Sequence, residues 1–179
     1  MTTTKQIDDK REDCMPQSDP WSIRYLIRRD MEEVLQIEKD SFGCPWSIDD
    51  FLGALRQRNC IGMVAINGHG KIVGFMICTL EKWLGTGPGT GNTYLSLISL
   101  AVSPKWRYCG IGRQFLETLA RKMTQQRHTH CQIIVAERNV PAQLWLRECG
   151  INAVAVDRDH FRNGNDSQDG YVFEMYPAR

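Results

Sequence analysis

The chain from Leu100 to Arg113 reads LAVSPKWRYCGIGR, and this stretch decides the expected fold. An apolar run ends at Val102, a proline follows two residues later, and two glycines come before a new amphipathic run. Proline ends a central strand, and glycine permits the sharp turn from which a helix can start. The stretch therefore predicts a strand, a short loop and a helix that opens on Gly110 and Gly112.

A helix that opens on glycines is a candidate anion site. The first N–H groups of a helix lack acceptors inside it, and the positive end of the helix dipole lies there. Glycine lets a phosphate approach without meeting a Cβ atom, and Arg107 or Arg113 could add charge at the rim. A plain strand-to-helix turn is the alternative, and Gly-x-Gly alone does not decide between the two. The stretch lacks the Gly-Lys-Ser/Thr of a P-loop and does not complete a Gly-x-Gly-x-x-Gly fingerprint.

Composition indicates one globular domain. The chain has 179 residues, of which 42% are hydrophobic and 24% charged, and its formal net charge is +1. Such a balance gives no overall field that would favour nucleic acid, so a phosphate ligand needs a local site. No signal peptide or membrane-spanning run is expected. Residues 1–20 are polar and aperiodic, which predicts a flexible tail before a single domain over residues 21–179.

Cysteine usage favours a reducing cytoplasm. The seven cysteines are an odd number, and no two of them form a Cys-x-x-Cys pair. Several lie inside apolar runs, where cysteine behaves as a small hydrophobic residue. A disulfide framework and a metal site are therefore both disfavoured.

Periodicity and turn residues predict the order β-α-α-β-β-β-α-β-α-β-β. Asp30 should cap the first helix in a capping box with Glu33, and Ser47 should cap the second. Strands are expected at 23–27, 60–66, 72–80, 94–102, 131–136, 151–156 and 170–175. The second helix should face inward with Ile48, Phe51, Leu52 and Leu55, the third should span 110–126, and the fourth should start at Asn139. The glycine-rich run 85–91 is either a plain hairpin connection or a binding loop.

The pattern Arg-x-x-Gly-x-Gly at 107–112, after Ala-Val-x-Pro, resembles the CoA-binding signature of the GCN5-related N-acetyltransferase (GNAT) superfamily. The resemblance covers about Ile23 to Tyr176 and looks strongest toward the ribosomal-protein-alanine N-acetyltransferases. The stretches that carry this narrower similarity are Glu38–Phe42 leading into Pro45-Trp46-Ser47, 100–104, Asn139-x-x-Ala142 leading to Gly150, and Arg158–Phe161, where the family usually has a pair of tyrosines.

The resemblance implies an α/β GNAT fold: a mixed, mostly antiparallel sheet of about seven strands with four helices and a splayed central parallel strand pair. It implies acetyl-CoA as cosubstrate and no metal. Asn139 would bond the pantetheine side, a role compatible with its expected N-cap role. The pantetheine and acetyl group would lie along Leu100, Ala101 and Val102. The pyrophosphate would lie on the turn formed by Arg107, Tyr108, Cys109, Gly110, Ile111, Gly112 and Arg113.

The sequence departs from the family at its chemical residues. The family's general base is a Glu five residues before the Asn, and that position is Ile134 here. Its general acid is a Tyr four residues before the Gly, and that position is Leu146. Glu137, at the exit of the same strand, is the candidate base, with an exposed loop carboxylate as the alternative. Positions 134 and 137 differ by an odd number, so an unbroken strand would turn them to opposite faces.

Other candidates remain open. His160 is a possible base near neutral pH. Cys149 could replace the acid, and Ser96 or Ser99 could bond water or the thioester, although packing roles fit these residues as well. Trp46, His160 and Phe161 would flank the acceptor groove by analogy with the family.

The expected activity is transfer of acetyl from acetyl-CoA to a protein N-terminal α-amine, such as that of a ribosomal protein, by direct attack in a ternary complex. An α-amine has a pKa of about 8, so roughly a tenth of it is neutral at pH 7 and a weak base could suffice. The enzyme would be cytoplasmic, with no nucleic acid or membrane partner. Two alternatives remain: a small amine or a lysine side chain as acceptor, and a CoA-binding module that has lost catalysis.

Overall fold

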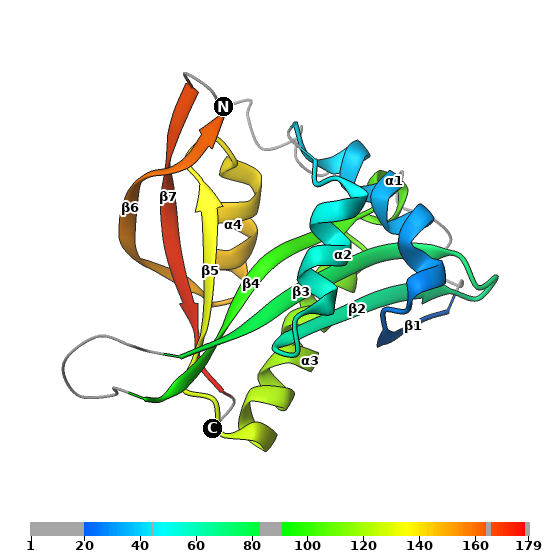
Figure 1. Ribbon diagram of the computed structural model, residues 1–179, viewed down its shortest axis with the longest axis horizontal. Coiled ribbons are helices and arrows are strands. Elements are labelled where there is room, and N and C mark those ends of the chain that lie inside the picture. The colour runs from blue at the N-terminus through cyan, green and yellow to red at the C-terminus, as the bar shows by residue number, and fades with distance from the viewer. Residues whose placement is uncertain (1–19, 44, 83–90, 164–165, 178–179) are drawn as a thin grey trace, which may run out of the picture. The chain divides into compact units, whose positions relative to one another are not determined.

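The computed structural model describes residues 20–43, 45–82, 91–163 and 166–177 (Figure 1). This part of the chain contains seven strands and four α-helices, which confirms the expected order. The elements are β1 Trp21–Tyr25, α1 Met31–Ser41, α2 Ile48–Arg56, β2 Cys60–Asn67, β3 Ile72–Lys82, β4 Thr93–Val102, α3 Ile111–Gln126, β5 Cys131–Ala136, α4 Val140–Glu148, β6 Asn152–Asn163 and β7 Asp166–Met175. Two short 3-10 turns, η1 Arg28–Asp30 and η2 Pro104–Trp106, complete them.

The strands form one mixed sheet in the order β1-β2-β3-β4-β5-β7-β6. β4 and β5 are parallel, and the pairs β1–β2, β5–β7 and β6–β7 are antiparallel. The parallel register joins residues 95–97 of β4 to 131–133 of β5. A parallel pair of this kind needs a crossover connection, and α3 supplies it. The expected α/β class and the parallel central pair are therefore confirmed.

The chain forms two compact units. The first contains residues up to Ile77 and Ser99–Leu116, and the second contains Cys78–Ile98 and Glu117 onward. In the first unit, Figure 1 shows α1 and α2 beside β2 and β3. Phe51 of α2 is fully buried there and makes edge-to-face contacts with the rings of Trp46 and Phe75 at 5.2 and 5.7 Å. The buried side chains packed around it are Met31, Val34, Ile37, Val64, Ile72, Ile77 and Ala101.

The second unit is organised around β5, β7 and β6, which lie side by side in Figure 1. The β5–β7 ladder is regular and pairs residues 131–136 with 175–170. Alternate residues of β5 are buried, namely Cys131, Ile133 and Val135. Burial raises the pKa of the Cys131 thiol to about 12, in keeping with its expected role as an apolar core residue.

Two local expectations at the helices were wrong. Asp30 precedes α1, but its carboxylate does not cap the helix. It accepts hydrogen bonds from the Arg24 guanidinium and the Ile27 N–H instead, and Glu33 accepts from the Ile72 N–H. The ion pair of Asp30 with Arg24, its local bond to Ile27 and the contact of Glu33 with β3 therefore replace the expected capping box. Ile48 is 50% exposed, because it begins α2 outside the buried stripe. The Ser47 cap is confirmed, since Ser47 Oγ accepts from the Asp50 N–H.

The last two strands are longer than the sequence indicated. β6 reaches Asn163 and β7 begins at Asp166, whereas strands of about six residues were expected at 151–156 and 170–175. The added part of β6 is highly charged and lacks apolar alternation, so periodicity could not reveal it. The expected tail at residues 1–20 lies almost entirely outside the described residues, and the glycine-rich run 85–91 does so except for Gly91.

Candidate functional site

The turn between β4 and α3 has the geometry of an anion cradle. Gly110 has a φ of +87°, which favours glycine, and a Cβ atom built on it would meet nothing within 4 Å. Ile111 begins α3 and is 1% exposed, and the Gln114 N–H donates to the Gly110 carbonyl at 3.0 Å. The N–H groups of the first turn, which come before Gln114, have no acceptor inside the helix. The turn therefore combines donors, an open approach and a positive dipole end.

The rest of the turn is held by its own side chains. Tyr108 adopts a φ of +63°, uncommon for a residue other than glycine, and its ring is 86% exposed. Arg107 donates from Nε to the Val102 carbonyl at 3.1 Å and from Nη2 to Ser41 Oγ at 3.3 Å. Arg107 thus ties the turn to β4 and to the end of α1. Arg113, in contrast, is exposed and turned to solvent. Together these residues fit a pyrophosphate, because a fixed backbone and a positive rim face open space.

The end of β4 packs closely against β3. A Cβ atom on Gly74 of β3 would lie 3.1 Å from the Ala101 carbonyl oxygen, so glycine is needed for this approach. The Ser103 N–H donates to the Val73 carbonyl at 2.9 Å. Ala101 is buried in the core of the first unit, while Leu100 and Val102 are half-buried. Strand alternation turns these two residues to the face opposite Ala101.

A buried carboxylate links this strand to the segment before α2. Glu38 of α1 is 2% exposed, and its two oxygens accept from the Trp46 N–H and from Ser99 Oγ, both at 3.2 Å. Burial raises the pKa of Glu38, and the two hydrogen bonds oppose that rise. Trp46 is thereby fixed relative to β4. Glu38 begins one of the stretches that carry the family resemblance, but no role was predicted for it. Its signal was the spacing of four residues from Val34, which places a charged residue on the apolar face of α1.

The β6–β7 hairpin brings three predicted or neighbouring site residues together. His160 Nδ1 lies 2.8 Å from Asp157 Oδ2, and the imidazole contacts the Phe161 ring edge-on with centroids 4.7 Å apart. The sequence predicted His160 and Phe161 and missed Asp157. Trp46, which was expected to flank the same groove, belongs to the other unit.

The residues around α4 occupy the positions that the sequence indicated. Asn139 caps the helix, and its Oδ1 accepts from the Ala142 N–H at 3.3 Å, as expected for an N-cap. Glu137 lies just beyond the end of β5 and is exposed. Because the strand ends at Ala136, its alternation does not constrain the Glu137 side chain. Leu146 is 1% exposed, and its side chain has no ionisable proton to donate. Cys149 is the half-buried C-cap residue of α4, and its N–H bonds into the last turn of the helix.

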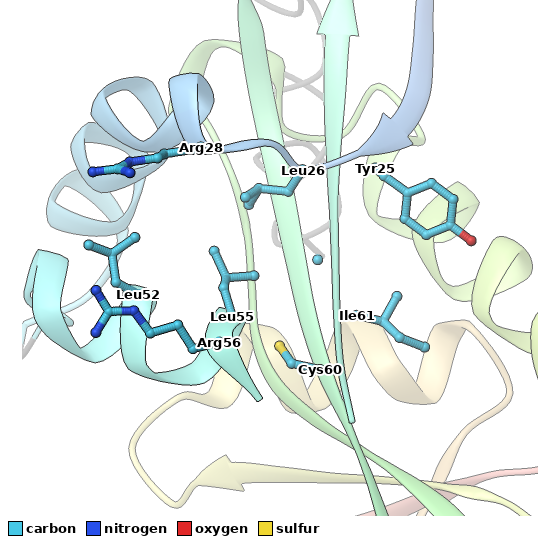
Figure 2. A pocket seen from close by; sticks show the side chains of 9 residues that line it. Tyr25, Leu26, Arg28, Leu52, Leu55, Arg56, Cys60 and Ile61 are labelled. Carbon is cyan, nitrogen blue, oxygen red and sulfur yellow. The ribbon is translucent and has the colours of Figure 1, made fainter. Parts of the chain in front are cut away.

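The first unit also contains a pocket of about 450 Å³ between α2 and the β1–β2 strands (Figure 2). None of the predicted site residues lines it. Figure 2 shows Leu52, Leu55 and Arg56 reaching it from α2 and Cys60 and Ile61 from β2. The remaining lining residues are Tyr25, Leu26, Arg28 and Gly62.

The described residues contain no group of three or more His, Cys, Asp or Glu side chains that could hold a metal ion. Within the same ranges, no helix is long and apolar enough to cross a membrane.

Comparison with known proteins gives consistent results. The model of the acetyltransferase (GNAT) family matches residues 22–151. An uncharacterized N-acetyltransferase of Methanocaldococcus jannaschii is 28% identical over 149 residues, which cover 81% of this chain and 86% of that protein.

Solved structures have the same fold at lower identity. The ribosomal-protein-S18-alanine N-acetyltransferase from Escherichia coli aligns with a TM-score of 0.72 at 19% identity, covering 89% of this chain and 96% of that one. Arabidopsis thaliana NAA60, in complex with a bisubstrate analogue, aligns with a TM-score of 0.77 at 16% identity, covering 88% and 98%. Both alignments extend the fold similarity beyond residues 22–151. The family match spans most of the chain and includes the glycine turn, so the chain belongs to the acetyltransferase (GNAT) family and is an N-acetyltransferase.

Proposed function

We propose that this N-acetyltransferase transfers the acetyl group of acetyl-CoA to the α-amine at the N-terminus of a protein. The observation that carries the proposal is the turn from Tyr108 to Arg113. It presents backbone donors at the start of α3 with open space over Gly110. A pyrophosphate is the kind of group that such a helix terminus binds.

The cosubstrate supplies an activated acetyl thioester. In this proposal the backbone from Tyr108 to Arg113 holds its pyrophosphate, and Leu100, Ala101 and Val102 lie along its pantetheine arm. Asn139 adds a bond on the pantetheine side. Its Oδ1 already accepts from the Ala142 N–H, and the amide nitrogen of the same side chain can donate at the same time.

The acceptor is chosen on chemical grounds. Attack on the thioester requires a neutral amine, and an α-amine with a pKa of about 8 is neutral far more often at pH 7 than a lysine amine with a pKa of about 10.4. The fold similarity to the Escherichia coli enzyme named for ribosomal protein S18 supports a ribosomal protein as the acceptor. Such an acceptor would place the reaction in the cytoplasm, without nucleic acid or membrane as partner.

Two other functions remain as outcomes of the tests. The first is acetyl transfer to a small amine or to a lysine side chain. A CoA-binding protein without catalysis is the second, and the apolar residues Ile134 and Leu146 on either side of Asn139 favour it, since neither can exchange a proton.

The CoA site is tested by Gly110→Asp, with Gly70→Asp as the matched control. Both glycines have positive φ, +87° and +78°, and open space around a built Cβ atom, so the two substitutions strain the backbone alike. Gly110→Asp places a carboxylate among the donors of the turn, so its affinity for CoA should fall by about tenfold or more, a change of about 1.4 kcal/mol. Gly70→Asp should bind CoA as the parent does. Calorimetry that gives both variants the same affinity contradicts the assignment.

The acceptor is tested by turnover. The parent is incubated with acetyl-CoA and matched peptides that offer a free α-amine, only a lysine amine, or neither. Acetylation confined to free N-termini supports the proposal. Transfer to lysine or to small amines identifies the first alternative, and CoA binding without transfer to any amine identifies the second.

A further inference from the structure

The β6–β7 hairpin contains a histidine and an aspartate arranged as a dyad. His160 Nδ1 lies 2.8 Å from Asp157 Oδ2. A carboxylate only accepts hydrogen bonds, so the Nδ1 proton of the imidazole points at Asp157. In the neutral ring Nε2 is then left with its lone pair available to accept a proton. About one third of the His160 side chain, 34%, is accessible to solvent.

A bulge in β6 produces this arrangement. Asp157 pairs with Gly170 and Phe161 pairs with Gln168, so three residues of β6 stand opposite one residue of β7. Hydrogen bonds hold these three residues of β6 in place. Asp159 adopts a φ of +54°, its N–H donates to Asp169 Oδ1 at 3.1 Å, and its carboxylate accepts from Ser167. Bulges of this kind turn a side chain away from the direction that regular alternation would give it.

The bulge turns His160 across β7 toward β5. A Cβ atom built on Gly170 would lie 2.6 Å from Ile134 Cγ2 and 3.0 Å from His160 Cβ. The side chains of Ile134 and His160 therefore both pack directly over Gly170, and the absence of a Cβ atom there permits their approach. Gly170 pairs with Ala136, the last residue of β5, so this contact lies at the carboxyl end of that strand.

The position matters because β5 is the parallel partner of β4. In sheets with parallel strands, ligands bind beyond the carboxyl ends of the strands. β5 itself offers no acid or base on the face of Ile134, because its neighbours on that face are Gln132 and Ala136. Two titratable side chains lie on this face: Glu174, which pairs with Gln132 near the start of β5 and accepts from the Tyr176 hydroxyl, and His160, which packs near the end of the strand.

We propose that His160, oriented by Asp157, is the catalytic base that accepts the proton of the acceptor amine. The inference rests on the proposed function. The amine nitrogen bonds to the thioester carbonyl carbon, and its excess proton passes to Nε2 of His160, directly or through one water. The C–S bond breaks with its electron pair on sulfur, and the CoA thiolate takes a proton from solvent. The imidazolium then returns its proton to solvent, so the products are the acetylated amine and CoA.

The charges around the imidazole are of both signs. Asp157 faces Nδ1 directly at 2.8 Å. On β6 itself, Arg158 is ion-paired with Asp169 of β7, Asp159 accepts from Ser167, and Arg162 Nε donates to the Asp159 carbonyl. From β5 and β7 the residues at the imidazole are the uncharged Ile134 and Gly170. Asp157 is therefore the charged group that contacts the imidazole directly.

The experiment compares His160→Gln and Asp157→Asn with the parent, and uses His69→Gln as the matched control on a different turn. Three quantities are measured on each protein: CoA affinity by calorimetry, the pH dependence of kcat with the best peptide, and the ring resonance of each histidine by NMR. A ring-resonance shift on adding a peptide–CoA conjugate gives a readout that needs no turnover. General base catalysis is worth about 10²–10⁴-fold, so His160→Gln should lower kcat by about that factor at unchanged CoA affinity.

Asp157→Asn tests the dyad in a protein that keeps the imidazole. Without the carboxylate the imidazole is no longer held in this orientation, so kcat should fall while CoA affinity stays that of the parent. The conjugate should shift the His160 resonance and leave that of His69 in place.

The outcomes separate the two proposals. A parent that acetylates no amine overturns the proposed function. An active parent whose kcat and pH profile are unchanged by His160→Gln overturns only the role of His160. The orienting role of Asp157 is overturned if Asp157→Asn leaves kcat at the value of the parent.

Discussion

Gly170→Ala adds one methyl group at the point where the side chains of His160 and Ile134 pack over β7, and so tests whether this packing holds His160 in place. Gly170 lies in a regular strand and its φ is outside the left-handed region, so alanine fits the backbone. The added Cβ atom would stand 2.6 Å from Ile134 Cγ2. Two carbon atoms in ordinary contact are about 3.5–4.0 Å apart, so a side chain must move by about 1 Å. The contact at 3.0 Å to His160 Cβ requires about half that movement.

These distances set the expected magnitudes. Overpacking of this kind costs about 1–3 kcal/mol of stability. A displacement of about 1 Å at a catalytic group costs about 10²-fold in rate. Gly170→Ala should therefore lower kcat by about one to two orders of magnitude while CoA affinity stays near that of the parent. Gly53→Ala in α2, where a Cβ atom meets nothing within 4 Å, is the control and should change neither.

A second substitution decides whether the loss comes from this contact. Ile134→Ala removes Cγ2, so the double variant Gly170→Ala/Ile134→Ala should recover most of the lost kcat and stability. The assays are steady-state kinetics with the best peptide, CoA calorimetry and urea unfolding. The reasoning is refuted if Gly170→Ala keeps full kcat, or if relief of the 2.6 Å contact restores stability without any gain in rate.

Two further predictions concern the first unit. Phe51→Ala removes a fully buried ring that contacts Trp46 and Phe75, so urea unfolding should show a loss of about 3–5 kcal/mol, and a loss below 1 kcal/mol would contradict its place in the core. Glu38→Gln does not ionise; its Oε1 can still accept from the Trp46 N–H, and its Nε2 can donate to Ser99 Oγ. Because burial raises the folded-state pKa of Glu38 above its ordinary 4.5, the parent loses stability as pH rises through that folded-state pKa. The stability of the variant relative to the parent should therefore increase from pH 4 upward, and a difference that shrinks with pH would contradict the argument.

Much of the fold could be read from local patterns. Ser47 and Asn139 cap the helices that they were expected to cap, and β5 has the expected bounds. These features depend on residues within a few positions of one another. Asp30 was misjudged for the opposite reason: its partner Arg24 comes from a neighbouring strand, and this contact outweighs the local capping pattern.

The candidate site was predictable only in part. The glycine turn is a contiguous motif, and its positive φ at Gly110 follows from the residue type. The pairing of His160 with Asp157 depends on a bulge of a charged strand, and no periodicity of residue types indicates such a bulge. Glu38 was missed because a charged residue in a helix usually faces water, whereas here two donors from distant segments satisfy it in the core.

The bulge has a second consequence, for the solubility of the protein. β6 is the last strand of the sheet, so one of its edges has no neighbour in the described part of the chain. An exposed edge of regular backbone is a template for pairing with another molecule. Its first half carries exposed Val154 and Val156, which would favour such pairing. A register shift at Val154 and the extra residues beyond Asp157 both interrupt the row of N–H and C=O groups, so a foreign strand would meet only short regular stretches of this edge.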